Sequence, residues 1–112
     1  MITKIYTQLK TSNLNSYWPG QHQGLCDKRY CVVKENIQVA FPNTRVGYRL
    51  LDIIVFVPIS SYVQVAPYVR EIKAALKEFP LWYAGETPII PDDEKKAYTT
   101  SIQYQILKKM EG

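Results

Sequence analysis

One histidine and two cysteines are the residues of this 112-residue chain whose types could hold a metal ion or attack a substrate. His22, Cys26 and Cys31 have the spacing H-x3-C-x4-C, and Asp27 lies between the cysteines. Structural zinc sites usually draw their ligands as two close pairs, so this spacing does not predict one, and we expect neither metal nor cofactor. Cys31 falls in a predicted strand, where a thiol behaves as a small buried apolar group, and no disulfide is expected in a reducing cytoplasm.

Proton-transfer chemistry has a single histidine to work with. His22 lies in a glutamine-rich loop with no serine or cysteine nucleophile in a known motif, so we interpret it as a solvated loop side chain. Asp92, Asp93 and Glu94 are consecutive, and consecutive loop carboxylates do not converge on one ion. P-loop, G-x-G-x-x-G, H-E-x-x-H and G-x-S-x-G motifs are all missing from the sequence. An enzyme is therefore not expected.

Length and composition bound the remaining classes. A chain of 112 residues predicts a single domain, residues 1–112. The net charge is +4, but lysine and arginine are scattered along the chain. Nine tyrosines favour a protein-contacting surface, because the ring buries area while its hydroxyl tolerates water. No apolar run approaches the roughly 20 residues that cross a bilayer, and no signal peptide is evident, so we expect synthesis in the cytoplasm and no membrane partner.

The most apolar stretch, residues 48–58, is the predicted central strand. Leu51, Ile53, Val55 and Val57 alternate onto one face, and the opposite face is apolar apart from Asp52. A strand that is apolar on both faces is expected to be covered twice, once within the subunit and once by a partner.

An amphipathic helix is predicted to follow this strand and to cover its first face. Ser60 or Ser61 is the expected N-cap. Pro67 is expected at the start of the regular helix, after a looser lead-in turn over residues 61–66. The apolar stripe recurs at steps of three and four and comprises Tyr62, Val65, Val69, Ile72, Leu76 and Phe79.

The flanking segments complete the predicted fold. Residues 1–13 predict a short helix, residues 30–35 and 37–41 predict strands joined across a bulge, and residues 42–45 predict the turn of an antiparallel hairpin. Residues 80–97 are interpreted as a long exposed loop, and residues 98–106 as a strand with one apolar and one polar face. The predicted class is α/β (α+β), with a single mostly antiparallel sheet and the N-terminal and main amphipathic helices on one face.

Three stretches carry a resemblance to a known family: residues 48–58 (YRLLDIIVFVP), residues 68–77 (YVREIKAALK) and residues 97–104 (AYTTSIQY). The residue patterns of these stretches, and their order along the chain, resemble those of the phage tail-completion or tail-terminator proteins, also described as minor capsid or head–tail joining proteins. The resemblance implies a structural virion or prophage protein that forms a ring, commonly a hexamer, on the head-proximal end of a siphophage-type tail tube. Its implied partners are copies of itself, the tail tube protein and the head connector, with DNA passing through the lumen without sequence recognition.

Candidate assembly residues lie on the second face of the central strand and in the predicted long loop. Alternatives from other classes stay open: a small nucleic-acid-binding module, a neighbouring head-completion or tail-tube protein, or a small enzyme with a deep pocket that holds His22 with Asp27 or Glu35. The candidate assembly residues are Tyr48, Leu50, Ile54, Phe56, Trp82, Tyr83, Ile89, Ile90, Asp92 and Asp93.

Overall fold

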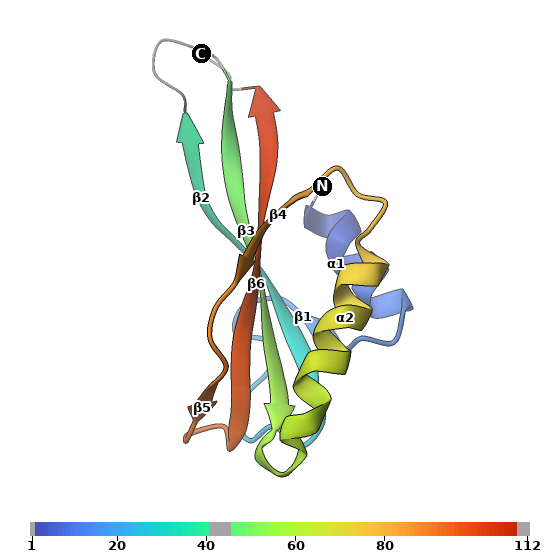
Figure 1. Ribbon diagram of the computed structural model, residues 1–112, viewed down its shortest axis with the longest axis vertical. Helices are drawn as coiled ribbons and strands as arrows, with labels where there is room; N and C mark the ends of the chain where they lie inside the picture. Colours follow the sequence, from blue (N-terminus) through green and yellow to red (C-terminus); the bar gives the residue numbers. More distant parts are fainter. Residues whose placement is uncertain (1, 41–45, 110–112) are drawn as a thin grey trace.

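The computed structural model describes residues 2–40 and 46–109, with side chains described for residues 2–35 and 49–106. Two helices and one sheet make up this part of the chain, and the turn predicted over residues 42–45 lies outside it (Figure 1). The elements in chain order are α1 (Ile2–Thr11), β1 (Ser16–Tyr17), β2 (Tyr30–Ala40), β3 (Val46–Pro58), the 3₁₀ helix η1 (Ile59–Gln64), α2 (Val65–Ala75), β4 (Trp82–Glu86), β5 (Ile90–Asp92) and β6 (Ala97–Lys109).

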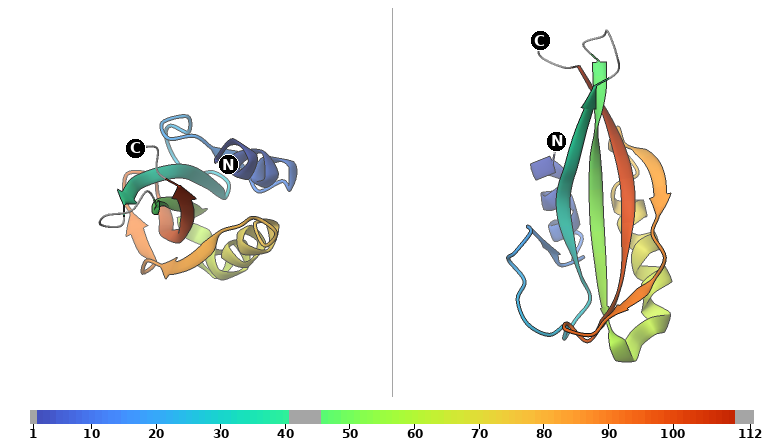
Figure 2. Two further views of the ribbon diagram at one scale, coloured as in Figure 1. Left: turned by 90° about the horizontal axis from the view of Figure 1, so that it is seen from above. Right: turned by 90° about the vertical axis from the view of Figure 1, so that its left-hand side faces the viewer.

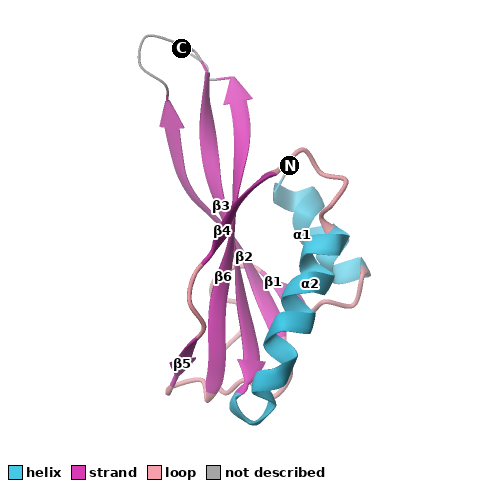
Figure 3. Cartoon of the chain, viewed as in Figure 1, coloured by secondary structure: helices cyan, strands magenta, loops and turns pink. Residues whose placement is uncertain are grey.

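The six strands form one mostly antiparallel sheet in the order β1-β2-β3-β6-β4, with β5 also pairing with β6. Only β1, which the sequence did not predict, runs parallel to its neighbour β2. Both α helices lie on the same side of the sheet (Figure 3). The predicted α+β class, with a mostly antiparallel sheet, is therefore confirmed.

The core lies between the sheet and the two helices. β3 contributes the predicted face of Leu51, Ile53, Val55 and Val57, each at most 1% exposed. From the helix side Val65, Val69, Ile72 and Leu76 are buried as predicted, joined by Ile5 and Leu9 of α1. β6 adds Thr100, Ile102, Tyr104 and Ile106, which confirms the two-sided pattern of the last strand. Branched apolar side chains alternate onto one face of each strand, which is what a half-covered sheet requires.

The prediction of the apolar helical stripe is wrong at its N-terminal end. Tyr62 is 53% exposed, and Tyr68, which the stripe omitted, is fully buried. The cause is the 3₁₀ helix η1, in which Ser61 has non-helical backbone angles. Because a 3₁₀ turn advances three residues rather than 3.6, Tyr62 is rotated away from the stripe of α2.

At the start of α2 the predicted N-cap is wrong, whereas Pro67 lies where it was predicted. Neither η1 nor α2 has a side-chain N-cap bond, so the predicted cap by Ser60 or Ser61 is wrong. Pro67 lies in the first turn of α2, where a missing N–H costs no helical hydrogen bond. The lead-in turn predicted before it is present as η1.

β2, β3 and β6 extend beyond the helices as a narrow blade, and the chain measures 49 × 26 × 23 Å (Figure 1). The register of β2 against β3 shifts between Glu35 and Gln38, which confirms the predicted bulge that joins two strand segments. β3 pairs with β6 along its whole length, from Val46 opposite Lys109 to Pro58 opposite Ala97. The central strand is therefore paired on both sides.

Residues 80–97 are not the long loop that the sequence predicted. They form β4 and β5, both of which pair with β6. The register of β4 shifts between Tyr83 and Gly85, and Gly85 has a φ of +133°, a conformation that glycine adopts readily. This bulge interrupts the alternation of side chains, which explains why the strand does not stand out in the sequence.

Candidate assembly surface

The sheet has a second face, turned away from the helices, and the strand register shows which side chains lie on it. Leu50 pairs with Gln105, which in turn pairs with Trp82 of β4. Directly paired residues point to the same side of a sheet, and every second residue along a strand follows them. The accessible side chains assigned in this way are Val32, Lys34, Leu50, Asp52, Ile54, Trp82, Ile90, Asp92, Thr99, Ser101, Gln103 and Gln105, and we call this set the open face.

Apolar side chains gather on the open face, and the most exposed lie near its β4–β5 edge. Trp82 is 66% exposed and Ile90 is 55% exposed, while Leu50 and Ile54 are half-buried. The β6 residues between them, Ser101, Gln103 and Gln105, are polar but uncharged. A large exposed aromatic residue beside aliphatic ones and neutral polar groups is typical of a protein–protein contact. The same face also carries the charged residues Lys34, Asp52 and Asp92.

Five of the ten predicted assembly residues thus share the open face: Leu50, Ile54, Trp82, Ile90 and Asp92. The side chain of Tyr48 lies outside the described part of the chain. The sequence pattern did not predict β4 and β5 as strands, so it could not show that their residues lie on this face. Their pairing with β6 does so.

Phe56 is not available to a partner, which corrects its assignment to the interface. It is 9% exposed and stacks on Tyr30 with ring centroids 4.7 Å apart. Together with Cys26 and Ala97 these rings form a second small core on the side of the sheet away from the helices. The segment between β1 and β2 covers this end of the sheet, so a second apolar layer already exists within the subunit (Figure 2).

Tyr83 and Ile89 belong to the other side of the sheet. The Tyr83 hydroxyl donates to the carboxylate of Glu86, and Lys73 of α2 lies 2.9 Å from that carboxylate. These two hydrogen bonds, from Tyr83 first and Lys73 second, hold the pKa of Glu86 below its ordinary value. Ile89 lines a groove of about 410 Å³ between α2 and the segment that joins β4 to β5. The predicted interface residues are therefore divided between two faces.

Asp92 and Asp93 have different surroundings. The Asp92 carboxylate accepts a hydrogen bond of 3.1 Å from the backbone N–H of Lys95, which closes the turn between β5 and β6. Asp93 is exposed within that turn. The acidic run thus contains one residue with a structural role, Asp92, while the charges of Asp93 and Glu94 face solvent.

His22 is not the solvated loop side chain that the sequence suggested. Its ring is stacked on Tyr30, with 3.7 Å between ring centroids, and its Nδ1 is buried without a hydrogen-bond partner. Burial, followed by the nearby charge of Lys95, lowers the pKa of His22, so the ring is neutral at pH 7. A cavity of about 280 Å³ beside it is lined by residues that include Asp27, Asn15 and Tyr17.

The two thiols are free and buried, Cys26 at 6% exposure and Cys31 at 0%. Cys31 confirms the prediction of a buried strand thiol. Cys26 belongs to the second small core, and its thiol donates to the Lys28 carbonyl at 3.2 Å. Within residues 2–40 and 46–109 no group of three or more His, Cys, Asp or Glu side chains is placed to hold a metal ion.

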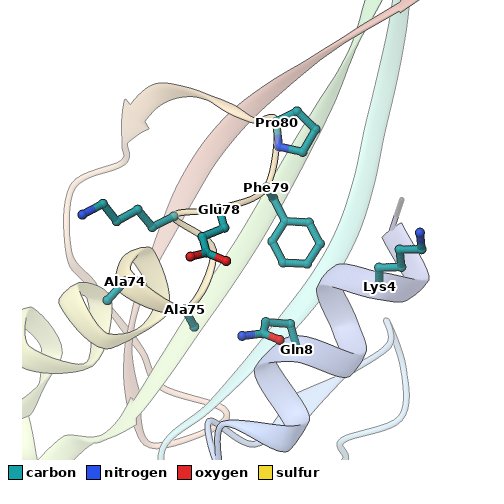
Figure 4. A pocket seen from close by; sticks show the side chains of 8 residues that line it. Lys4, Gln8, Ala74, Ala75, Glu78, Phe79 and Pro80 are labelled. Atoms are coloured by element: carbon teal, nitrogen blue, oxygen red, sulfur yellow. The ribbon is translucent and has the colours of Figure 1, made fainter.

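A pocket of about 770 Å³ lies between α1 and the C-terminal end of α2 and was not anticipated from the sequence (Figure 4). Ala75 and Phe79 supply apolar walls, and Lys4, Gln8 and Glu78 are among its polar lining. Phe79 was predicted to pack in the core stripe, but it is only partly buried because it borders this cavity. The helical layer therefore has a hollow side as well as a packed one.

Neither helix in the described part of the chain combines the length and the apolar character needed to cross a bilayer. Comparison with models of known protein families and with curated proteins finds no match to this sequence.

Proposed function

We propose that the chain is a structural assembly protein of a siphophage-type virion or prophage, which closes into a ring, commonly a hexamer, on the head-proximal end of the tail tube. The observation that carries the proposal is the open face, where Trp82, Ile90 and two half-buried aliphatic residues lie on a side of the sheet without helices. Covering such a patch stabilises an assembly, because apolar area removed from water contributes about 25 cal/mol per Å². The proposed partners are other copies of this chain, the tail tube protein and the head connector, with DNA in the lumen.

The shape of the subunit supports the same proposal. A closed ring repeats one contact between two different surfaces of neighbouring copies. The subunit presents a blade beyond its helical layer and a sheet with two unlike edges, β1–β2 on one side and β4–β5 on the other (Figure 2). Unlike edges on opposite sides are what head-to-tail contacts need.

The test is the mass of the purified protein over a range of concentrations, by light scattering and native mass spectrometry, followed by mixing with tail tubes that lack a terminator. We expect a single ring species that grows with protein concentration, binds one end of the tube and stops its extension. A protein that stays monomeric at high concentration and leaves tube length unchanged contradicts the proposal. Binding of DNA by the monomer, weakened by salt, would instead indicate the nucleic-acid-binding alternative.

A further inference from the structure

We propose that neighbouring copies in the ring join edge to edge, with β4 of one copy adding as an antiparallel strand to the outer edge of β2 in the next. This inference rests on the proposed ring and names the contact that closes it. It would make the sheets of all subunits one continuous sheet around the ring.

The first edge is that of β4. The strand pairs with β6 on one side and ends the sheet on the other, so within the described chain its outer backbone groups have no strand partner. Such an edge invites another strand, and proteins usually shield it with charges, proline or cover. Here Trp82 is 66% exposed beside it. An open edge next to an exposed aromatic ring is a binding surface for a strand, with the ring as its anchor.

The second edge is that of β2. β1 pairs only with Cys31 and Val32, so in the part of the chain that the structure describes the edge from Val33 onward has no strand neighbour. Lys34 and Glu35, which follow, are exposed. Charged residues of this kind discourage indiscriminate pairing while they leave a specific partner possible.

Direction and height make the two edges compatible. Each step from β2 to β3, β6 and β4 is antiparallel, so β4 runs opposite to β2, and two copies in the same orientation meet as an antiparallel pair. The two edges also lie at the same level along the strand direction. Gly85 of β4 pairs with Gln103, Gln103 pairs with Asp52, and Asp52 pairs with Lys34 of β2. In a ring with cyclic symmetry, neighbouring copies are not displaced along the ring axis, so parts of the two edges that lie at the same level meet. Because twist tilts strands against the axis of a closed sheet, we assign the strand pair and its direction rather than a register.

The partner is a second copy in head-to-tail arrangement rather than a two-fold dimer. Pairing of β4 with β4 would also be antiparallel, but it would use one edge twice, leave β2 open and stop at two subunits. Pairing of β4 with β2 uses both edges once per copy and can continue until the ring closes.

Cysteine crosslinking of assembled rings tests this contact. Ala84→Cys places a thiol on β4 and Lys34→Cys places one on β2, and both positions are exposed. The native thiols Cys26 and Cys31 are buried, so the wild-type protein treated with the same reagent gives the background level of crosslinking. With a short bifunctional thiol reagent, rings of the double variant should give a covalent ladder up to the full ring. A mixture of the two single variants should stop at covalent dimers, because each copy then has one reactive thiol.

The controls separate failure of this contact from failure of the ring. In the control double variant, Ala84→Cys is combined with Ser60→Cys instead of Lys34→Cys, and Ser60 is an exposed residue of η1. This variant should still form rings but should give no covalent ladder. Rings of the double variant that give no crosslink overturn the edge contact and leave the proposed function standing. Covalent dimers from Ala84→Cys alone show β4–β4 pairing and also overturn it. A protein that forms no ring overturns both proposals.

Discussion

The imidazole of His22 lies flat against the ring of Tyr30, with an angle of 12° between the two planes. Tyr30 in turn stacks on Phe56, so a loop residue, a residue at the start of β2 and a residue of β3 form one continuous pile of rings. The edge of Tyr17 meets both His22 and Tyr30. This pile closes one end of the sheet on the side away from the helices.

Protonation of His22 should therefore loosen this end of the molecule. Its pKa is lowered in the folded state, so between that value and the ordinary value of about 6.5 the unfolded chain binds more protons. The stabilising contribution is present above about pH 6.5 and is lost as the pH falls below it. We expect the unfolding free energy, measured with urea at pH 7.5 and 5.5, to fall more for the wild type than for His22→Phe, which keeps a ring but cannot titrate. Equal losses in the two proteins would contradict this.

Both thiols should resist alkylation in the folded protein. Burial is the largest cause that raises the pKa of each thiol, to about 11 for Cys26 and to about 11 for Cys31. Because the thiolate is the reacting species, little is present at pH 8. Iodoacetamide at pH 8 should leave the native mass unchanged and add two groups once the protein is unfolded in urea. Rapid single labelling of the native protein would show that the loop over Cys26 opens.

Tyr68→Phe should destabilise the fold through one hydrogen bond. The Tyr68 hydroxyl donates to the carbonyl of Leu14 from a fully buried position, and it ties α2 to the segment after α1. Removing the donor leaves a buried acceptor weakly satisfied, which costs about 1–3 kcal/mol. Tyr62→Phe, at an exposed tyrosine, is the matched control and should change the unfolding free energy by less than about 0.5 kcal/mol. Similar values for the two variants would show that this hydrogen bond contributes little.

Leu76→Ala should open a cavity in the core. Leu76 is 2% exposed where the end of α2 packs over the sheet, and truncation of a buried leucine typically costs about 2–5 kcal/mol. Leu25→Ala makes the same chemical change at a position that is 57% exposed, so it should cost less than about 0.5 kcal/mol. Urea titration of both variants measures the difference, and a small loss for Leu76→Ala would contradict the assigned core.

Trp82→Ala should separate assembly from folding. The side chain is 66% exposed, so its removal should leave the unfolding free energy of the monomer within about 0.5 kcal/mol of the wild type. An interface anchor of this kind contributes about 2 kcal/mol or more to association, so the dissociation constant of the ring should rise at least tenfold. Val63→Ala, exposed but distant from the open face, is the control and should assemble normally. Unchanged assembly of Trp82→Ala would remove the open face from the contact.

Much of the core followed from local pattern alone. Alternation along residues 51–57 and 98–106, the steps of three and four from Val65 to Leu76, and the bulge in β2 are short-range signals, and each predicted its element or its buried face. These signals work because burial on one side of a strand or helix imposes its period on the sequence. The buried Cys31 followed from the same rule.

Tertiary structure alone decided the outer parts of the sheet and the second core. β4 and β5 are short, β4 carries a bulge, and both are placed by their pairing with β6, so no local period marks them. Tyr62 turned outward because the kinked η1 changed the helical phase, and His22 became partly buried because distant rings were available to stack on it. Which exposed residues share one face depends on strand register. Register is set by pairing between segments far apart in the chain, and that information is not contained in any single stretch of the sequence.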